Sequence, residues 1–169
     1  NRALDGTTDK YYCSRTAFPP TVAGSKVRIS KSFGAITLRE VEVWAIVDGV
    51  ETNVALEANG GVATQSSDYE NAGCGLFLAR YAIDGRTFSY AGSLSCEMIT
   101  VTVPDQPNPW WQVDLGAMYD ITRIEIFNRD DACYGSVNAC QGLLSGAKVE
   151  VIGGLLLAGS KVRISKPSG

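Results

Sequence analysis

The chain has 169 residues, enough for one domain with a sizeable core, and its content of 45% hydrophobic and 20% charged residues is that of an ordinary globular protein. The net charge is −3 and no basic cluster exceeds two or three residues, which argues against a nucleic-acid-binding protein. The longest apolar run, GGLLLAG, is far too short to span a bilayer. Histidine is absent, which excludes a Ser-His-Asp or Cys-His nucleophile and a His-containing zinc site.

Alternation of apolar and polar residues dominates the chain, as in β-strands. It covers the segments 25–30 (SKVRIS), 39–46 (REVEVWAI), 110–115 (WWQVDL), 120–128 (DITRIEIFN), 147–153 (AKVEVIG) and 160–165 (SKVRIS). Clusters of Gly, Asn, Asp, Ser and Pro separate these segments. Residues 74–83 (CGLFLARYAI) could hold a turn or two of helix. The pattern predicts an all-β protein, and short strands with long loops favour a β-sandwich.

Two adjacent tryptophans stand in the segment NPWWQVDLG (108–116). In an extended chain Trp111, Val113 and Leu115 share one side, and the polar residues between them share the other. This pattern predicts a half-buried strand with Trp111 in the core. Trp110 points the other way and follows a proline, so a packed position and a ligand-contacting position both stay open for it.

The segment AGSKVRISK occurs twice, at 23–31 and at 158–166. The interval is too long for a solenoid unit but has the size of one domain. We therefore expect residues 1–47 to carry the closing strands of one repeat and 53–169 to carry the opening and middle strands of the next. DGVET, between them, is expected to be the joint.

Neither part alone can bury both faces of a sandwich. We therefore expect residues 26–45 to pack against 53–152, which gives one complete domain in permuted order. One strand position cannot hold both SKVRIS copies, so one copy is expected to lie outside it or to pair with a neighbouring molecule. The alternative arrangement is an exchange of strands between two chains, which would make a homo-oligomer.

Several segments resemble the F-type lectins, or fucolectins, in the order in which the family has them. They are 53–67 (NVALEANGGVATQSS), 81–86 (YAIDGR), 93–98 (SLSCEM), 108–116 (NPWWQVDLG), 121–131 (ITRIEIFNRDD) and 144–153 (LSGAKVEVIG), together with 26–45, which resembles the closing strands. The family has a jelly-roll β-sandwich that it shares with the discoidin-like domains of coagulation factors. The resemblance implies this fold and a sugar-binding module rather than an enzyme.

In the family a histidine and two arginines hold the hydroxyl groups of fucose. Here Met98 stands at the histidine position, Arg129 and Asp131 are retained, and Ser136 lies near the position of the second arginine. Because an unpaired buried hydroxyl group costs on the order of 1–3 kcal/mol, the resemblance implies altered or lost fucose specificity.

Any bound glycan is expected at Arg129, Asp131 and Glu97, because a guanidinium group can bridge two sugar oxygens. The aromatic candidates for stacking on the sugar lie in the surrounding loops: Tyr69, Tyr90 and Tyr134. Each of them is open to the other interpretation, an exposed loop tyrosine without function.

The resemblance also implies a calcium site, built from a glycine-containing loop, a following serine and a glutamate of the closing strand. The matching groups are the side chains of Asp84, Ser95 and Glu40 and the carbonyl oxygens of Tyr81, Arg86 and Arg39. Such hard oxygen ligands suit Ca²⁺. The alternative is that Asp84 only caps a tight turn through the backbone amides.

Five cysteines in a chain of this length favour an oxidising compartment, and the odd number leaves at least one without an intrachain partner. Arg39 stands where the family has the cysteine partner of the residue that matches Cys96. The resemblance therefore makes Cys74 the expected partner of Cys96, and it lets Cys133 and Cys140 close an enlarged loop. Simple buried thiols stay open as the alternative.

These observations predict a secreted carbohydrate-binding protein whose partners are cell-surface or secreted glycans and glycoproteins, with no nucleic acid bound and no insertion into a membrane. One alternative is a discoidin-like adhesion or assembly module that binds no sugar. The other is a glycosidase, for which Asp130, Asp131 and Glu97 lie in suitable loops, although no acid/base pair stands out.

Overall fold

The computed structural model describes residues 21–87, 99–129, 142–153 and 163–165. Its strands are β1 (Val22–Ser30), β2 (Phe33–Gly34), β3 (Thr37–Leu38), β4 (Glu40–Val47), β5 (Val50–Asn53), β6 (Val62–Gln65), β7 (Glu70–Asn71), β8 (Gly75–Leu76), β9 (Thr100–Val101), β10 (Gln106–Pro107), β11 (Trp110–Phe127), β12 (Lys148–Ile152) and β13 (Arg163–Ser165). The 3₁₀ helices of this part of the chain are η1 (Glu57–Asn59), η2 (Ala79–Ala82) and η4 (Gly142–Leu144). None of its helices is long and apolar enough to cross a membrane. The described part of the chain is therefore all-β, as the sequence predicts.

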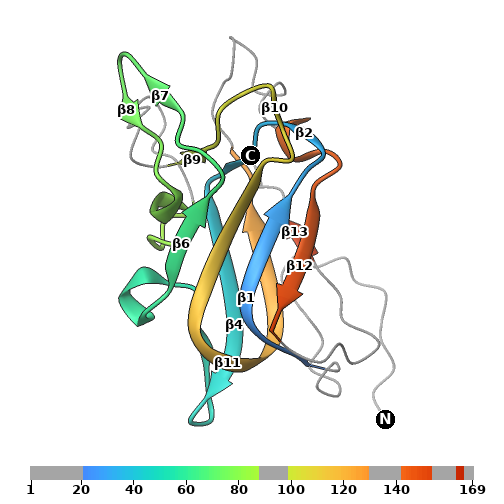
Figure 1. The fold of residues 1–169 in the computed structure, drawn as a ribbon. Coiled ribbons are helices and arrows are strands. Elements are labelled where there is room, and N and C mark those ends of the chain that lie inside the picture. The colour runs from blue at the N-terminus through green and yellow to red at the C-terminus, as the bar shows by residue number, and fades with distance from the viewer. Residues whose placement is uncertain (1–20, 88–98, 130–141, 154–162, 166–169) are drawn as a thin grey trace, which may run out of the picture.

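The long strand β11 connects the two layers of the sandwich. Its first half pairs with β6 and with most of β1, and its second half pairs with β4, β13 and the first residues of β1. Between the halves the chain bends, because Gly116 has a φ of +77° and its N–H group donates to Asp114 Oδ1 at 3.0 Å. The register with β1 shifts at the same place, between Gly24 and Lys26. Figure 1 shows this strand curving from one layer to the other.

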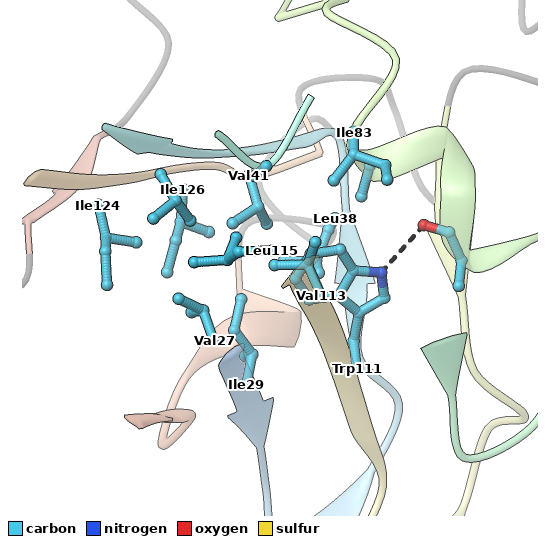
Figure 2. Close-up of a cluster of buried hydrophobic side chains, with 14 of the residues drawn as sticks. Val27, Ile29, Leu38, Val41, Ile83, Trp111, Val113, Leu115, Ile124 and Ile126 are labelled. Atoms are coloured by element: carbon cyan, nitrogen blue, oxygen red, sulfur yellow. Dashed lines mark hydrogen bonds between the residues drawn. The ribbon is translucent and has the colours of Figure 1, made fainter. Parts of the chain in front are cut away.

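Inward-facing residues of both layers form one hydrophobic core. Trp111, Val113 and Leu115 are 0%, 0% and 2% exposed, which confirms the predicted alternation along this strand. Figure 2 shows them packed against Val27 and Ile29 of β1, Val41 of β4, and Ile124 and Ile126 of the second half of β11. Trp110 is half-buried on the outer face, where the Arg28 guanidinium lies 4.4 Å from its ring centroid. Trp110 therefore lies outside the core, stacked against Arg28, and a ligand-contacting position stays open for it.

Two details of the strand prediction are corrected by the structure. Residues 110–115 and 120–128 belong to the single strand β11 rather than to two separate strands. Many short strands between β1 and β11, such as β6, were not predicted. The expected joint DGVET forms a tight hairpin, in which Asp48 and Gly49 have φ values of 50° and 82° and connect β4 to β5. Its role as a joint between two repeats stays a prediction.

The two SKVRIS copies occupy different positions in the sheet. The first copy lies in β1, antiparallel to both β11 and β12. The second ends in β13, which runs parallel to the end of β11, with Ile164 opposite Ile126. The second copy thus lies outside the position of the first. Residues 26–45 and 110–127 are directly paired through β1, β4 and β11, while the assignment of the segments to two repeats stays a prediction.

The indole N–H group of Trp111 donates to the Ala79 carbonyl at 3.0 Å inside the core. We expect Trp111→Phe to lower the free energy of unfolding by about 1–3 kcal/mol, because it leaves this carbonyl unpaired and a small cavity beside it. Trp110→Phe makes the same change on the outer face and should cost less than about 1 kcal/mol. Urea unfolding of both variants tests this, and equal losses would contradict the central role of Trp111.

Candidate functional site

The site predicted from the sequence lies at the end of the sandwich where β4 begins and β11 ends. Glu40 is the register partner of Phe127, and the Arg39 N–H group donates to the Phe127 carbonyl at 2.9 Å. Arg129 follows two residues later. The structure therefore brings the expected sugar-binding arginine to the same end as the expected metal-binding residues Arg39 and Glu40.

The second part of the site is the turn that follows η2. Trp111 holds Ala79 at the start of this helix, and Ala82 and Ile83 at its end are fully buried. The Ile83 carbonyl accepts from the Glu57 N–H group at 2.9 Å. These contacts place Asp84 at the surface of the core, where its side chain is 19% exposed.

Asp84 caps this turn, as the simpler of the two interpretations requires. Its Oδ1 accepts from the Arg86 N–H group at 2.9 Å, and its Oδ2 lies 3.6 Å from a guanidinium nitrogen of Arg86. Burial raises the pKa of Asp84, and the Arg86 N–H group opposes this effect. These contacts of Asp84 do not test whether its carboxylate also binds a metal ion.

Glu40 meets the turn from the opposite strand. The Gly85 N–H group donates to Glu40 Oε1 at 3.0 Å. Glu40 is 0% exposed, and its Oε2 is buried without a hydrogen-bond partner in the described part of the chain. Burial raises the pKa of Glu40 to about 8, against the Gly85 hydrogen bond that lowers it, and the negative charge of Asp84 raises it further. Gly85 was not predicted to hold Glu40, although the dipeptide Asp-Gly in YAIDGR is a turn signal.

The other expected metal-site residues surround these two carboxylates. Arg39 is 2% exposed, and Tyr81 is half-buried in η2 with the Arg80 guanidinium 5.5 Å from its ring centroid. The Arg86 side chain is 58% exposed. Within residues 21–87, 99–129, 142–153 and 163–165, no three His, Cys, Asp or Glu side chains gather as metal ligands. A cation here would therefore depend on carbonyl oxygens and on Ser95, which lies outside the described residues.

Among the expected sugar-binding residues, Arg129 and Tyr69 are described. Arg129 is half-buried, and its N–H group donates to Asn128 Oδ1 at 2.8 Å. The ring of Tyr69 stacks on Phe77 with centroids 5.9 Å apart, so one of its faces is packed against the small cluster of Phe77, Ile99 and Val101. The remaining residues of the expected sugar pocket lie outside the described residues: Asp131, Glu97, Met98, Tyr90 and Tyr134.

Cys74 packs against the same small cluster and is not a free thiol. Its expected partner Cys96 lies outside the described residues, as do Cys133 and Cys140. Both pairings stay predictions.

Comparison with known proteins finds one matching family model and several related proteins. The family model described as a NedA-like, galactose-binding domain matches residues 81–155. Fucolectin-1 of Anguilla japonica is 38% identical over 98 residues, which are 58% of this chain and 51% of that protein. Fucolectin-5 of the same organism is 42% identical over 49% of this chain and 40% of its own length. These matches support an F-type lectin-like, discoidin-like domain.

Fucolectin of Anguilla anguilla is 39% identical over 49% of this chain and 48% of its own length. The chain spans about half the length of the curated relatives that it matches. No solved structure gives a significant match.

The buried carboxyl group of Glu40 predicts a pH dependence of stability in calcium-free buffer. The unfolded chain loses this proton near its usual pKa of 4.5, whereas the folded protein keeps it until about pH 8. Stability should therefore fall as the pH rises through this interval, by on the order of 1.4 kcal/mol for each unit of pKa difference. The measurement is urea unfolding at several pH values in the presence of a chelator.

Glu40→Gln should remove this pH dependence and should be more stable than the wild type at pH 8. Glu57→Gln changes an exposed carboxylate of the neighbouring helix η1 and is the matched control. An unchanged pH profile in Glu40→Gln would contradict the burial cost.

Proposed function

We propose that the protein is a non-catalytic, secreted carbohydrate-binding domain whose glycan site surrounds Arg129 and which has altered or lost fucose specificity. The observation that carries the proposal is the meeting of Arg129, Glu40 and the Asp84–Gly85 turn at one end of the sandwich. The likeness to fucolectins supports carbohydrate binding in general. Loss of the second arginine and of the histidine supports a different specificity.

Arg129 supplies the chemistry of this site. Its guanidinium group can donate two parallel hydrogen bonds to adjacent hydroxyl groups of a pyranose ring. Half-burial reduces competition from water, which strengthens such bonds. Asp131 and Glu97 would accept hydroxyl protons, and a loop tyrosine would cover an apolar face of the sugar. The chain has no histidine to act as a general base near neutral pH, which supports recognition without turnover.

Arg129→Ala should reduce the affinity for the bound glycan at least tenfold, because a hydrogen bond to a charged group is worth about 1.5–3 kcal/mol. A glycan array identifies the ligand, and titration calorimetry measures the affinity of each variant. Arg80→Ala changes an exposed arginine of the nearby helix η2 and is the control. Undiminished binding by Arg129→Ala would overturn the site, and an array without any binding would favour the adhesion or assembly module.

We further propose that the Asp84 turn and Glu40 hold a structural Ca²⁺ ion, which would supply positive charge to both carboxylates. The buried Glu40 Oε2 supports this assignment, because a buried carboxylate oxygen without a partner is costly and a cation would satisfy it. Asp84, Ser95 and the carbonyl groups of Tyr81, Arg86 and Arg39 would complete the set of oxygen ligands. Held in this way, the turn and the start of β4 would support the loops beside Arg129.

Calcium should raise the melting temperature by several degrees, because an ion that binds only the folded state stabilises it by mass action. Asp84→Asn keeps an oxygen that can cap the turn but removes the charge, so this variant should lose the response to calcium and to a chelator. Glu57→Gln, which changes a carboxylate close enough to affect the pKa of Asp84, should keep the response. Identical melting curves with calcium and with chelator in the wild type would leave Asp84 as a turn cap alone.

A further inference from the structure

The outer face of the layer formed by β6, the first half of β11, β1 and β12 carries a row of polar side chains far from the core. Thr64, Gln112, Arg28 and Glu150 are register partners on adjacent strands, so they lie side by side across the layer. Their neighbours along the strands, such as Trp111 and Ile29, point into the core. The row is therefore held on a rigid surface.

Arg28 is the unusual member of this row. Its guanidinium carbon lies 4.4 Å from the centroid of the Trp110 ring, and its buried Nε has no hydrogen-bond partner in the described part of the chain. None of the ion pairs among the described residues involves Arg28. The stacking on Trp110 orients the guanidinium plane and leaves its donors available for a ligand.

The opposite layer contains a second arginine stacked on a tryptophan, Arg123, whose buried Nε also lacks a hydrogen-bond partner in the described part of the chain. Arg123 lies 4.7 Å from the centroid of the Trp44 ring, but its nitrogens also lie 3.5 Å from Glu125 and 3.9 Å from Glu51. The two arginines have the same aromatic support and differ in their carboxylate partners. Of this pair, only Arg28 has no carboxylate partner among the described residues, which leaves its charge for an external anion.

A hollow of about 220 Å³ opens beside the stacked pair. It is lined by Arg28, Ser30, Lys31, Asn108, Trp110 and Glu150. A second hollow of about 440 Å³ adjoins it, because its lining residue Gln112 is the register partner of Arg28. Thr64 and Gln112 of the second hollow can exchange hydrogen bonds with hydroxyl groups.

The charge at the smaller hollow is positive, although the whole chain has a net charge of −3. Glu150 is neutralised by Lys148 at 2.6 Å. Lys31 donates to the uncharged Leu143 carbonyl at 2.6 Å, so neither Lys31 nor Arg28 has an ion-pair partner among the described residues at the hollow. A carboxylate or sulfate group there would accept charge-assisted hydrogen bonds from the guanidinium group of Arg28, which the stacking on Trp110 already orients.

We propose that this outer face is a second glycan site, in which Arg28 binds the carboxylate or sulfate group of an acidic saccharide. Lys31 adds positive charge, and the neighbouring hollow accommodates the next sugar through Thr64 and Gln112. The choice of a saccharide rests on the proposed function, whereas the anion is indicated by Arg28 itself. The site is separate from Arg129, which follows the other end of β11.

The test is titration calorimetry of the whole chain with a sulfated heparin tetrasaccharide, a uronic-acid tetrasaccharide without sulfate, a neutral tetrasaccharide and inorganic sulfate. At least one acidic tetrasaccharide should bind, and which one binds identifies the anion. Arg28→Lys keeps the charge but loses the planar fork, so its affinity should fall at least tenfold. Arg123→Lys makes the same change on the opposite face and should bind as the wild type does, as should Arg129→Ala.

Equal affinity of Arg28→Lys and the wild type would overturn the proposal, as would an equal loss in Arg123→Lys. Binding of inorganic sulfate or of a single-stranded oligonucleotide as tightly as the tetrasaccharide would overturn the choice of a saccharide. Loss of acidic-glycan binding in Arg129→Ala would also overturn the second site, by assigning that ligand to the first. The proposed function is tested separately, because it fails if Arg129→Ala weakens the binding of no glycan.

Discussion

The hydrogen bond from the Trp111 indole to the Ala79 carbonyl is the contact on which the rest of the site depends. The Trp111 ring is fully buried between the layers, so its orientation is set by the whole core. Its single N–H group points out of the apolar cluster to the start of η2 (Figure 2). Because Asp84 and Gly85 follow two residues after that helix, the packing of the core determines where the turn meets Glu40.

The continuity of β11 transmits the same constraint to the rest of the molecule. Its first half contributes Trp111 to one layer, and its second half ends at Phe127, opposite Glu40 in the other layer. A shift of β11 along its axis would therefore separate both Trp111 from Ala79 and Phe127 from Glu40. These pairings join segments far apart in the sequence, as in other β-sandwiches. The residues of the site therefore come together only when the whole domain folds.

The polar groups divide into two kinds. The Lys26–Asp114 pair, at 2.6 Å, and the Arg123 contacts lie on outer faces, where each charge has an opposite charge beside it. Glu40 and Arg28 differ, because none of the ion pairs among the described residues includes either of them. Each also has a buried polar atom without a hydrogen bond among these residues, as does Arg123. Such unsatisfied buried polar atoms are uncommon in folded proteins.

Alternation in the sequence by itself determined the main strands and the side of each strand that is buried, because side chains of a strand alternate between core and solvent whatever the partner strand is. It predicted Trp111 in the core. It did not reveal the short strands, whose two to four residues are too few to show a period, or that the expected joint forms a hairpin at Asp48–Gly49. Among the site residues, the resemblance to a family selected Arg129, Glu40 and Asp84. Only the tertiary structure decided that Gly85 binds Glu40 and that Arg28 stacks on Trp110, because these contacts join distant segments through strand register, which no local pattern specifies.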